Sequence, residues 1–226
     1  MIGVFDSGDG GLCTVEKIRE LAPRADICFL ADRENAPYGT KSGSEIIRLA
    51  KRNIRLLKDA GADKILIACC SASSIYPALS EEEKRVAVPV IDATVRRAVE
   101  KTKNGKIGVI STALTARSGV FETKIKELLP SATVYTEPTQ ELVTLIESGV
   151  CDRNLRARSK EKIEKALLKI KKYPFDTLIL GCTHFPRLEN TISEILKKET
   201  VSSALEGARE ILKKTSGEGE GKIIFL

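Results

Sequence analysis

Short apolar runs alternate with amphipathic stretches along most of the chain. Residues 2–5, 26–32 and 64–68 are short and mainly apolar, which predicts strands buried in a sheet. Residues 44–60 instead repeat apolar side chains at helical spacing, and Gly61 stands where a helix commonly ends. Strands that alternate with helices in this way predict an α/β fold built on parallel sheets.

The same pattern starts again in the second half of the chain. Three later segments resemble three earlier ones in the same order, at separations of 105, 107 and 113 residues. The matching segments are 107–112 with 2–7, 124–130 with 17–23, and 176–182 with 63–69. A predicted helix at 154–172 precedes the last of them. These ordered matches predict two copies of one α/β unit.

The repeat divides the chain into two similar domains. We expect the first to span residues 1–93 and the second 94–202, with a fourth strand at 86–92 and a linker near 92–106. Residues 203–226 are predicted to form a helix, a glycine-rich loop and a last strand, and we expect them to complete the first domain. Open α/β sheets bind ligands at the carboxyl ends of their strands, so a single cleft between the domains is predicted as the site.

The composition is that of an ordinary globular protein, with 42% hydrophobic and 30% charged residues. The net charge of +6 lies largely in helical patterns without interleaved aromatic residues. This argues against a nucleic-acid partner, whereas a small anionic substrate would suit the charge. No apolar run approaches the roughly 18–20 residues that span a bilayer, and the start does not resemble a signal peptide. We therefore expect a cytoplasmic protein with no membrane partner.

Two of the six cysteines occupy matching places in the repeat. Cys69 follows the strand at 64–68, and Cys182 follows the corresponding strand of the second unit. His184, the only histidine, lies beside Cys182, and Asp6 is expected beside Cys69. Thiols on opposite sides of a substrate suit racemisation, since one can remove a proton while the other delivers one. Cys has an unperturbed pKa of about 8.5, so a thiolate and a thiol can coexist after modest tuning.

The residues also allow three other interpretations. Cys69, Cys70, Cys182 and His184 could ligate a metal ion, although they lack the usual paired C-x-x-C spacing. A Cys–His pair could instead serve a thiol hydrolase, which would leave the second cysteine unexplained. A two-lobed small-molecule binding protein without catalysis is the third alternative.

Four segments together resemble the glutamate racemase family, within the cofactor-independent aspartate/glutamate racemase superfamily. They are residues 5–12 (FDSGDGGL), 37–42 (PYGTKS), 68–73 (ACCSAS) and 181–186 (GCTHFP), and the likeness extends to about residue 190. It implies two α/β domains related by pseudo-twofold symmetry, with the active site in the cleft between them. It further implies racemisation of glutamate without cofactor or metal, to supply D-glutamate for peptidoglycan, and a possible homodimer. Aspartate or another acidic amino acid remains an alternative substrate.

The resemblance also assigns roles to individual residues. The implied catalytic residues are Cys69, Cys182, Asp6, His184 and Glu147. The implied substrate-binding residues are Asp6, Ser7, Pro37, Tyr38, Gly39, Cys70, Ser71, Thr112, Thr115, Thr183 and His184. One departure stands out: the family usually has Asn-Thr after its first cysteine, where this chain has Cys70-Ser71. Ser can replace the Thr hydroxyl, but a thiol cannot replace an amide that both donates and accepts hydrogen bonds.

Overall fold

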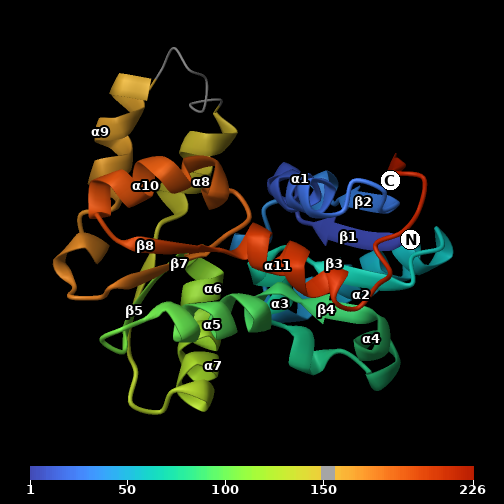
Figure 1. Ribbon diagram of the computed structural model, residues 1–226, viewed down its shortest axis with the longest axis horizontal. Coiled ribbons are helices and arrows are strands. Elements are labelled where there is room, and N and C mark those ends of the chain that lie inside the picture. Colours follow the sequence, from blue (N-terminus) through green and yellow to red (C-terminus); the bar gives the residue numbers. More distant parts are fainter. Residues whose placement is uncertain (149–155) are drawn as a thin grey trace.

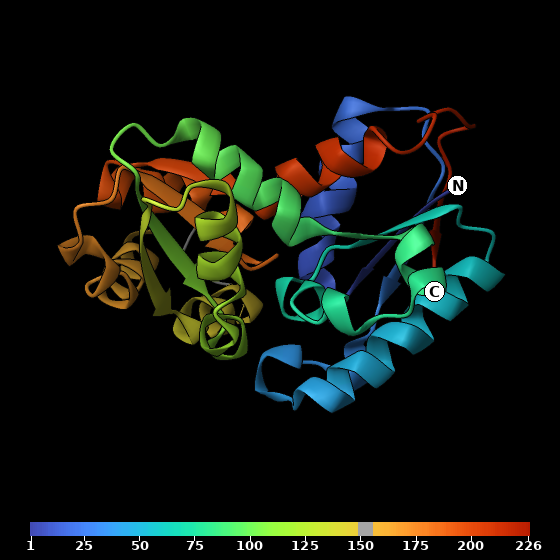
Figure 2. The same ribbon diagram turned by 90° about the horizontal axis from the view of Figure 1, so that it is seen from below.

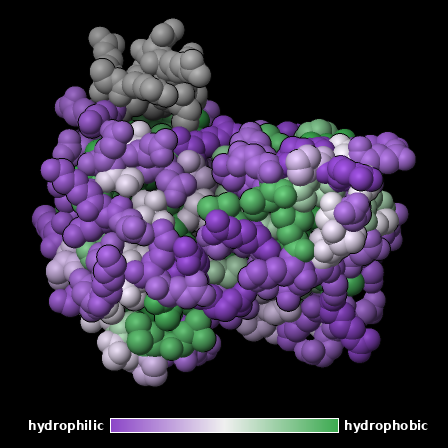
Figure 3. Space-filling model, in the orientation of Figure 1, coloured by the Kyte–Doolittle hydropathy of each residue, from purple (hydrophilic) through white to green (hydrophobic). Residues whose placement is uncertain are grey.

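Two parallel β-sheets lie side by side, each with helices on its faces (Figures 1 and 2). The computed structural model describes residues 1–148 and 156–226. The face seen in Figure 3 is mostly hydrophilic, as expected when the apolar segments form the interior. No helix within the described ranges is long and apolar enough to cross a membrane.

The first sheet has five parallel strands in the order β4-β3-β1-β2-β9. Its strands are β1 (Ile2–Asp6), β2 (Ile27–Ala31), β3 (Lys64–Ile67), β4 (Ala87–Pro89) and β9 (Ile223–Phe225). Its helices are α1 (Leu12–Leu21), α2 (Gly43–Asp59), α3 (Cys70–Ser73), α4 (Glu81–Val86) and α11 (Ser203–Leu212). The C-terminal strand β9 pairs in parallel with β2, so the end of the chain returns to the first sheet.

The second sheet has four parallel strands in the order β6-β5-β7-β8. Its strands are β5 (Lys106–Ser111), β6 (Thr133–Pro138), β7 (Thr177–Gly181) and β8 (Glu199–Ser202). Its helices are α6 (Ala113–Ser118), α7 (Val120–Leu128), α8 (Gln140–Glu147), α9 (Arg156–Ala166) and α10 (Glu189–Leu196). The helix predicted at 154–172 begins outside the described residues and ends earlier than expected, at Ala166.

The two sheets repeat one topology. Read from its other edge, the second sheet runs β8-β7-β5-β6, which matches β4-β3-β1-β2 strand for strand. The prediction of two similar parallel-sheet α/β domains is therefore confirmed. The strands that precede Cys69 and Cys182 are β3 and β7, which hold equivalent positions in the two sheets.

The connection between the sheets is a helix, α5 (Val90–Lys101), which corrects two predictions. The fourth strand ends at Pro89 rather than at residue 92, and the linker expected near 92–106 is mostly helical. Ile91, Val95 and Ala98 recur at helical spacing and are buried. They belong to one apolar core that also contains residues of both sheets and of α11. A short apolar run before a helix resembles a strand by composition, and packing decides between them.

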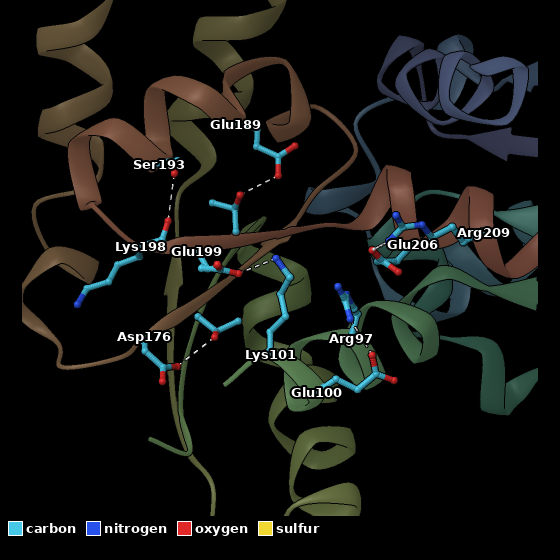
Figure 4. A network of polar contacts seen from close by, with 12 residues as sticks. Arg97, Glu100, Lys101, Asp176, Glu189, Ser193, Lys198, Glu199, Glu206 and Arg209 are labelled. Carbon is cyan, nitrogen blue, oxygen red and sulfur yellow. Dashed lines mark hydrogen bonds and ion pairs between the residues drawn. The ribbon is translucent and has the colours of Figure 1, made fainter. Parts of the chain in front are cut away.

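The sequence pattern also missed strand β8, whose four residues include only one apolar side chain, Val201. It pairs with β7, and polar contacts tie it to its neighbours (Figure 4). Thr200 donates to Glu189 of α10 at 2.8 Å, and Lys101 of α5 forms an ion pair with Glu199 at 2.7 Å. This edge of the second sheet is thus held by interactions between residues far apart in the chain.

Candidate active site

The carboxyl ends of β1, β3, β5 and β7 come together at a narrow pocket between the two sheets. Both Cys69 and Cys182 line it. The other lining residues are Ser7, Gly8, Ala36, Pro37, Tyr38, Gly39, Cys70, Ser71, Thr112, Gln140, Val143, Glu147, Gly181, Thr183 and His184. The cavity volume is about 30 Å³.

Cys69 lies two residues after β3, immediately before the short helix α3. Its Sγ donates to Ser7 Oγ at 3.6 Å, and the thiol is buried. Burial raises the pKa of Cys69 to about 12, and the nearby charge of Asp6 adds to this effect. Backbone N–H groups of Ala72 and Ser7 oppose it by stabilising the thiolate.

Cys182 follows β7 directly and belongs to a chain of three polar side chains. Its Sγ lies 3.6 Å from Nδ1 of His184, whose Nε2 lies 3.3 Å from Oε1 of Glu147. Burial raises the pKa of the Cys182 thiol, the backbone N–H of His184 opposes the shift, and Cys69 adds to it. His184 is itself buried, whereas Glu147 at the end of α8 is exposed. The arrangement gives the Cys182 proton a path towards solvent.

Gly10 makes room for the imidazole of His184. A Cβ at this position would lie 2.6 Å from Thr183 Oγ1 and 2.8 Å from His184 Nδ1. A Cβ hardly ever approaches other atoms so closely, so any larger residue at this position would displace the side chains of Thr183 and His184. The sequence pattern marked Gly10 only as part of a glycine-rich turn.

Asp6 ends β1 and connects the two domains. Its Oδ2 accepts hydrogen bonds from the backbone N–H groups of Gly8 at 3.2 Å and Gly11 at 3.0 Å. Its Oδ1 accepts one from Thr183 Oγ1 at 3.1 Å. Burial raises the pKa of Asp6, against the charge of His184 and these hydrogen bonds. Asp6 thus influences the Cys69 thiol by its charge, while its direct side-chain partner is Thr183 of the other domain.

Three hydroxyl groups form a buried triangle across the domain boundary. Ser71 Oγ lies 3.0 Å from Thr112 Oγ1 and 3.1 Å from Thr115 Oγ1, and the two threonine oxygens are 3.0 Å apart. Of the three, Ser71 and Thr112 line the pocket. The expected binding residues of the two domains are therefore brought together here, with hydroxyls that a ligand can engage.

The loop that contains Pro37, Tyr38 and Gly39 forms another wall. Tyr38 is almost fully buried, and its hydroxyl donates to Asp32 at 2.5 Å and accepts from Asn53 at 3.0 Å. Its side chain therefore fixes the loop to the first domain. A Cβ on Gly39 would lie 3.0 Å from that of Thr112, so the loop backbone approaches the second domain closely.

Cys70 lines the pocket, and its buried thiol lies beside the Ser203 side chain. Its side chain is 2% exposed and belongs to the same buried cluster as Val88 and Val90. Burial raises the pKa of this thiol well above its usual value, and Cys182 and Cys69 add to the shift. The position therefore contributes no amide to the pocket.

Sequence reasoning missed Gln140 and Val143. Both line the pocket from α8 and precede Glu147 by seven and four residues. Residues spaced i, i+3 and i+7 share one face of a helix. Glu147 was expected at the site, so its helical neighbours Val143 and Gln140 could have been predicted to face the pocket too.

The metal-ion alternative gains no support from the geometry. Within residues 1–148 and 156–226, no three His, Cys, Asp or Glu side chains are grouped as metal ligands would be.

Known proteins are similar to this chain along almost its whole length. A model of the family described as Asp/Glu/Hydantoin racemase matches residues 13–211. A glutamate racemase of Aquifex aeolicus (strain VF5) is 35% identical, over 99% of this chain and 87% of its own length. A crystal structure of a glutamate racemase isoform from Bacillus anthracis superposes with a TM-score of 0.89 at 32% identity, covering 100% of this chain and 86% of that one. The structure of glutamate racemase from Francisella tularensis in complex with D-glutamate gives 0.87 at 29% identity, covering 99% and 86%.

Proposed function

This chain belongs to the Asp/Glu/hydantoin racemase family, and on that basis we propose that it interconverts L- and D-glutamate without a cofactor. The observation that carries the proposal is the pair of thiols. Cys69 and Cys182 follow equivalent strands of two similar sheets and line the same pocket. The relative from Francisella tularensis, whose structure holds D-glutamate, supports the choice of substrate.

Racemisation at Cα requires a base on one face of the substrate and an acid on the other. The thiolate of one cysteine removes the proton from Cα, and the thiol of the other protonates the opposite face. Each turnover leaves the thiol and thiolate exchanged, ready for the opposite enantiomer. Burial raises the pKa values of both thiols, so forming the thiolate requires a proton acceptor beside each cysteine.

The two auxiliary groups differ in how they reach their cysteines. His184 Nδ1 lies beside Cys182 Sγ and takes up its proton, while Glu147 holds the other ring nitrogen. Asp6 serves Cys69. Its raised pKa suits a carboxyl group that exchanges a proton, and Ser7 Oγ lies next to the thiol. These roles make Cys69, Cys182, Asp6, His184 and Glu147 the proposed catalytic set.

The remaining lining residues are proposed to hold the substrate. Hydroxyl groups and backbone N–H groups can bind carboxylates without a full positive charge. The proposed binding residues are Ser7, Pro37, Tyr38, Gly39, Cys70, Ser71, Thr112, Thr115 and Thr183, together with Asp6 and His184. The hydroxyl triangle would exchange its internal hydrogen bonds for bonds to a carboxylate.

We further propose that the protein works in the cytoplasm, where the D-glutamate that it makes would supply peptidoglycan synthesis. We also propose the division into residues 1–93 with 203–226 and residues 94–202, which the pairing of β9 with β2 supports. A homodimer stays a prediction.

The test is to incubate the protein with L-glutamate in heavy water, without added cofactor, and to follow optical rotation and deuterium at Cα. Loss of rotation with deuterium uptake is expected, and neither a chelator nor Cys13→Ser should reduce it. Cys69→Ser and Cys182→Ser should each lower kcat by at least about 10³-fold, since removing an essential base forfeits most of the acid–base catalysis. Exchange with L-aspartate but not glutamate would correct the substrate, and exchange with neither would refute the function.

A further inference from the structure

Helix α8 presents three side chains to the pocket from the second domain: Gln140, Val143 and Glu147. Their spacing puts them on one face of the helix. Leu142 and Ile146 are buried in the core of the second domain and fix α8 in place. Gln140, at the start of this well-packed helix, is therefore held at the pocket wall.

The side-chain amide of Gln140 lacks a partner that it needs. Its Oε1 is buried, and it accepts no hydrogen bond from any described residue. Buried acceptors nearly always receive a hydrogen bond, because an unpaired one has lost its water without compensation. A ligand that donates a hydrogen bond at this point would satisfy it.

The chemistry of an acidic amino acid determines which of its groups can do so. At neutral pH its two carboxylates only accept hydrogen bonds, and its α-ammonium group carries the N–H donors. A charged donor also makes a stronger hydrogen bond than a neutral one. Among the described lining residues, none is Lys or Arg, so no neighbouring cation competes for this acceptor.

The opposite wall offers no equivalent group at Cys70. A thiol is only a weak acceptor, and Cys70 belongs to a buried apolar cluster. Gln140 is the one side-chain amide among the described lining residues.

We propose that Gln140 binds the α-ammonium group of the substrate amino acid through Oε1. The inference rests on the proposed racemase function and adds a specificity-determining residue to it. Gln140 then selects for amino acids over dicarboxylates of the same length, such as glutarate.

The experiment compares glutamate with glutarate, which has both carboxylates but no ammonium group. Gln140→Met removes the acceptor and keeps most of the side-chain volume. We expect KM for L- and D-glutamate to rise on the order of tenfold or more, with a smaller change in kcat. The inhibition constant of glutarate should change less than twofold. Thr144→Met, on an exposed position of the same helix, should change neither value.

Each other outcome overturns the inference in a recognisable way. Equal weakening of glutamate and glutarate would mean that the amide contacts a carboxylate. An unchanged KM would mean that Gln140 does not bind substrate, while racemisation itself stands. An unaltered protein that neither racemises nor binds glutamate would overturn the proposed function too, before any variant is made. Circular dichroism checks the fold, and Gln140→Leu gives the same comparison if the Met variant does not fold.

Discussion

The contact between Gly10 and His184 gives a sharp test of the proton path from Cys182. In Gly10→Ala, the added methyl group would lie 2.8 Å from His184 Nδ1, where ordinary contacts begin at 3.4 Å. The imidazole must therefore retreat by about 0.6 Å to restore an ordinary contact, and Nδ1 already lies 3.6 Å from Cys182 Sγ. A misplacement of about 1 Å at a catalytic group can cost on the order of 10²-fold in rate.

We therefore expect kcat for Gly10→Ala to fall by about 30- to 100-fold, with a loss of stability of about 1–3 kcal/mol from overpacking. The assay is the initial rate of optical-rotation loss from each enantiomer, with thermal unfolding measured on the same sample. Gly43→Ala is the matched control, since a Cβ at Gly43 meets nothing within 4 Å. A folded Gly10→Ala protein with kcat within threefold of the unaltered protein would refute the role of this contact.

Two other predictions concern Glu147 and the buried thiol of Cys69. Glu147→Gln keeps the side-chain size but removes the charge 3.3 Å from His184 Nε2. Because Glu147 is 55% exposed, kcat should fall only about two- to fivefold, corresponding to ~0.4–1 kcal/mol. Steady-state kinetics check this, and a loss above 10²-fold would show that Glu147 does more than orient the imidazole. In the folded protein, burial raises the pKa of the Cys69 thiol from 9.0 to about 12. Below pH 9 the thiol is neutral in both the folded and the unfolded state, so its ionisation does not reduce the free energy of unfolding there. As pH rises from about 9 to about 12, the unfolded thiol ionises first, and the free energy of unfolding falls by up to about 4 kcal/mol. Urea unfolding between pH 8.5 and 10.5 should show a shallower decline for Cys69→Ala, and equal declines would contradict the burial argument.

The sequence alone determined the general architecture and the central pair of thiols. Buried strands and amphipathic helices have local periodicities, so they could be recognised without knowing their neighbours. The repeat then assigned Cys69 and Cys182 equivalent places, and parallel topology put both at the carboxyl ends of strands. The single histidine next to Cys182 made His184 a candidate as well, and the motif resemblance added Glu147 and the expected binding residues. Of all these residues, only Asp6 and Thr115 do not line the pocket in the structure.

Only the tertiary structure decided which groups contact one another across the domain boundary. The bond from Thr183 to Asp6 joins residues 177 positions apart, and no local pattern encodes it. The same holds for β8, since pairing with β7 makes this short segment into a strand. The C-terminal strand was predicted from the sequence, and the structure adds that it pairs with β2. Helix α5 resembled a strand and linker until its buried face was seen within a core shared by both domains. Gln140 likewise gained its meaning from burial, because a sequence shows that an amide is present but not whether its oxygen has a partner.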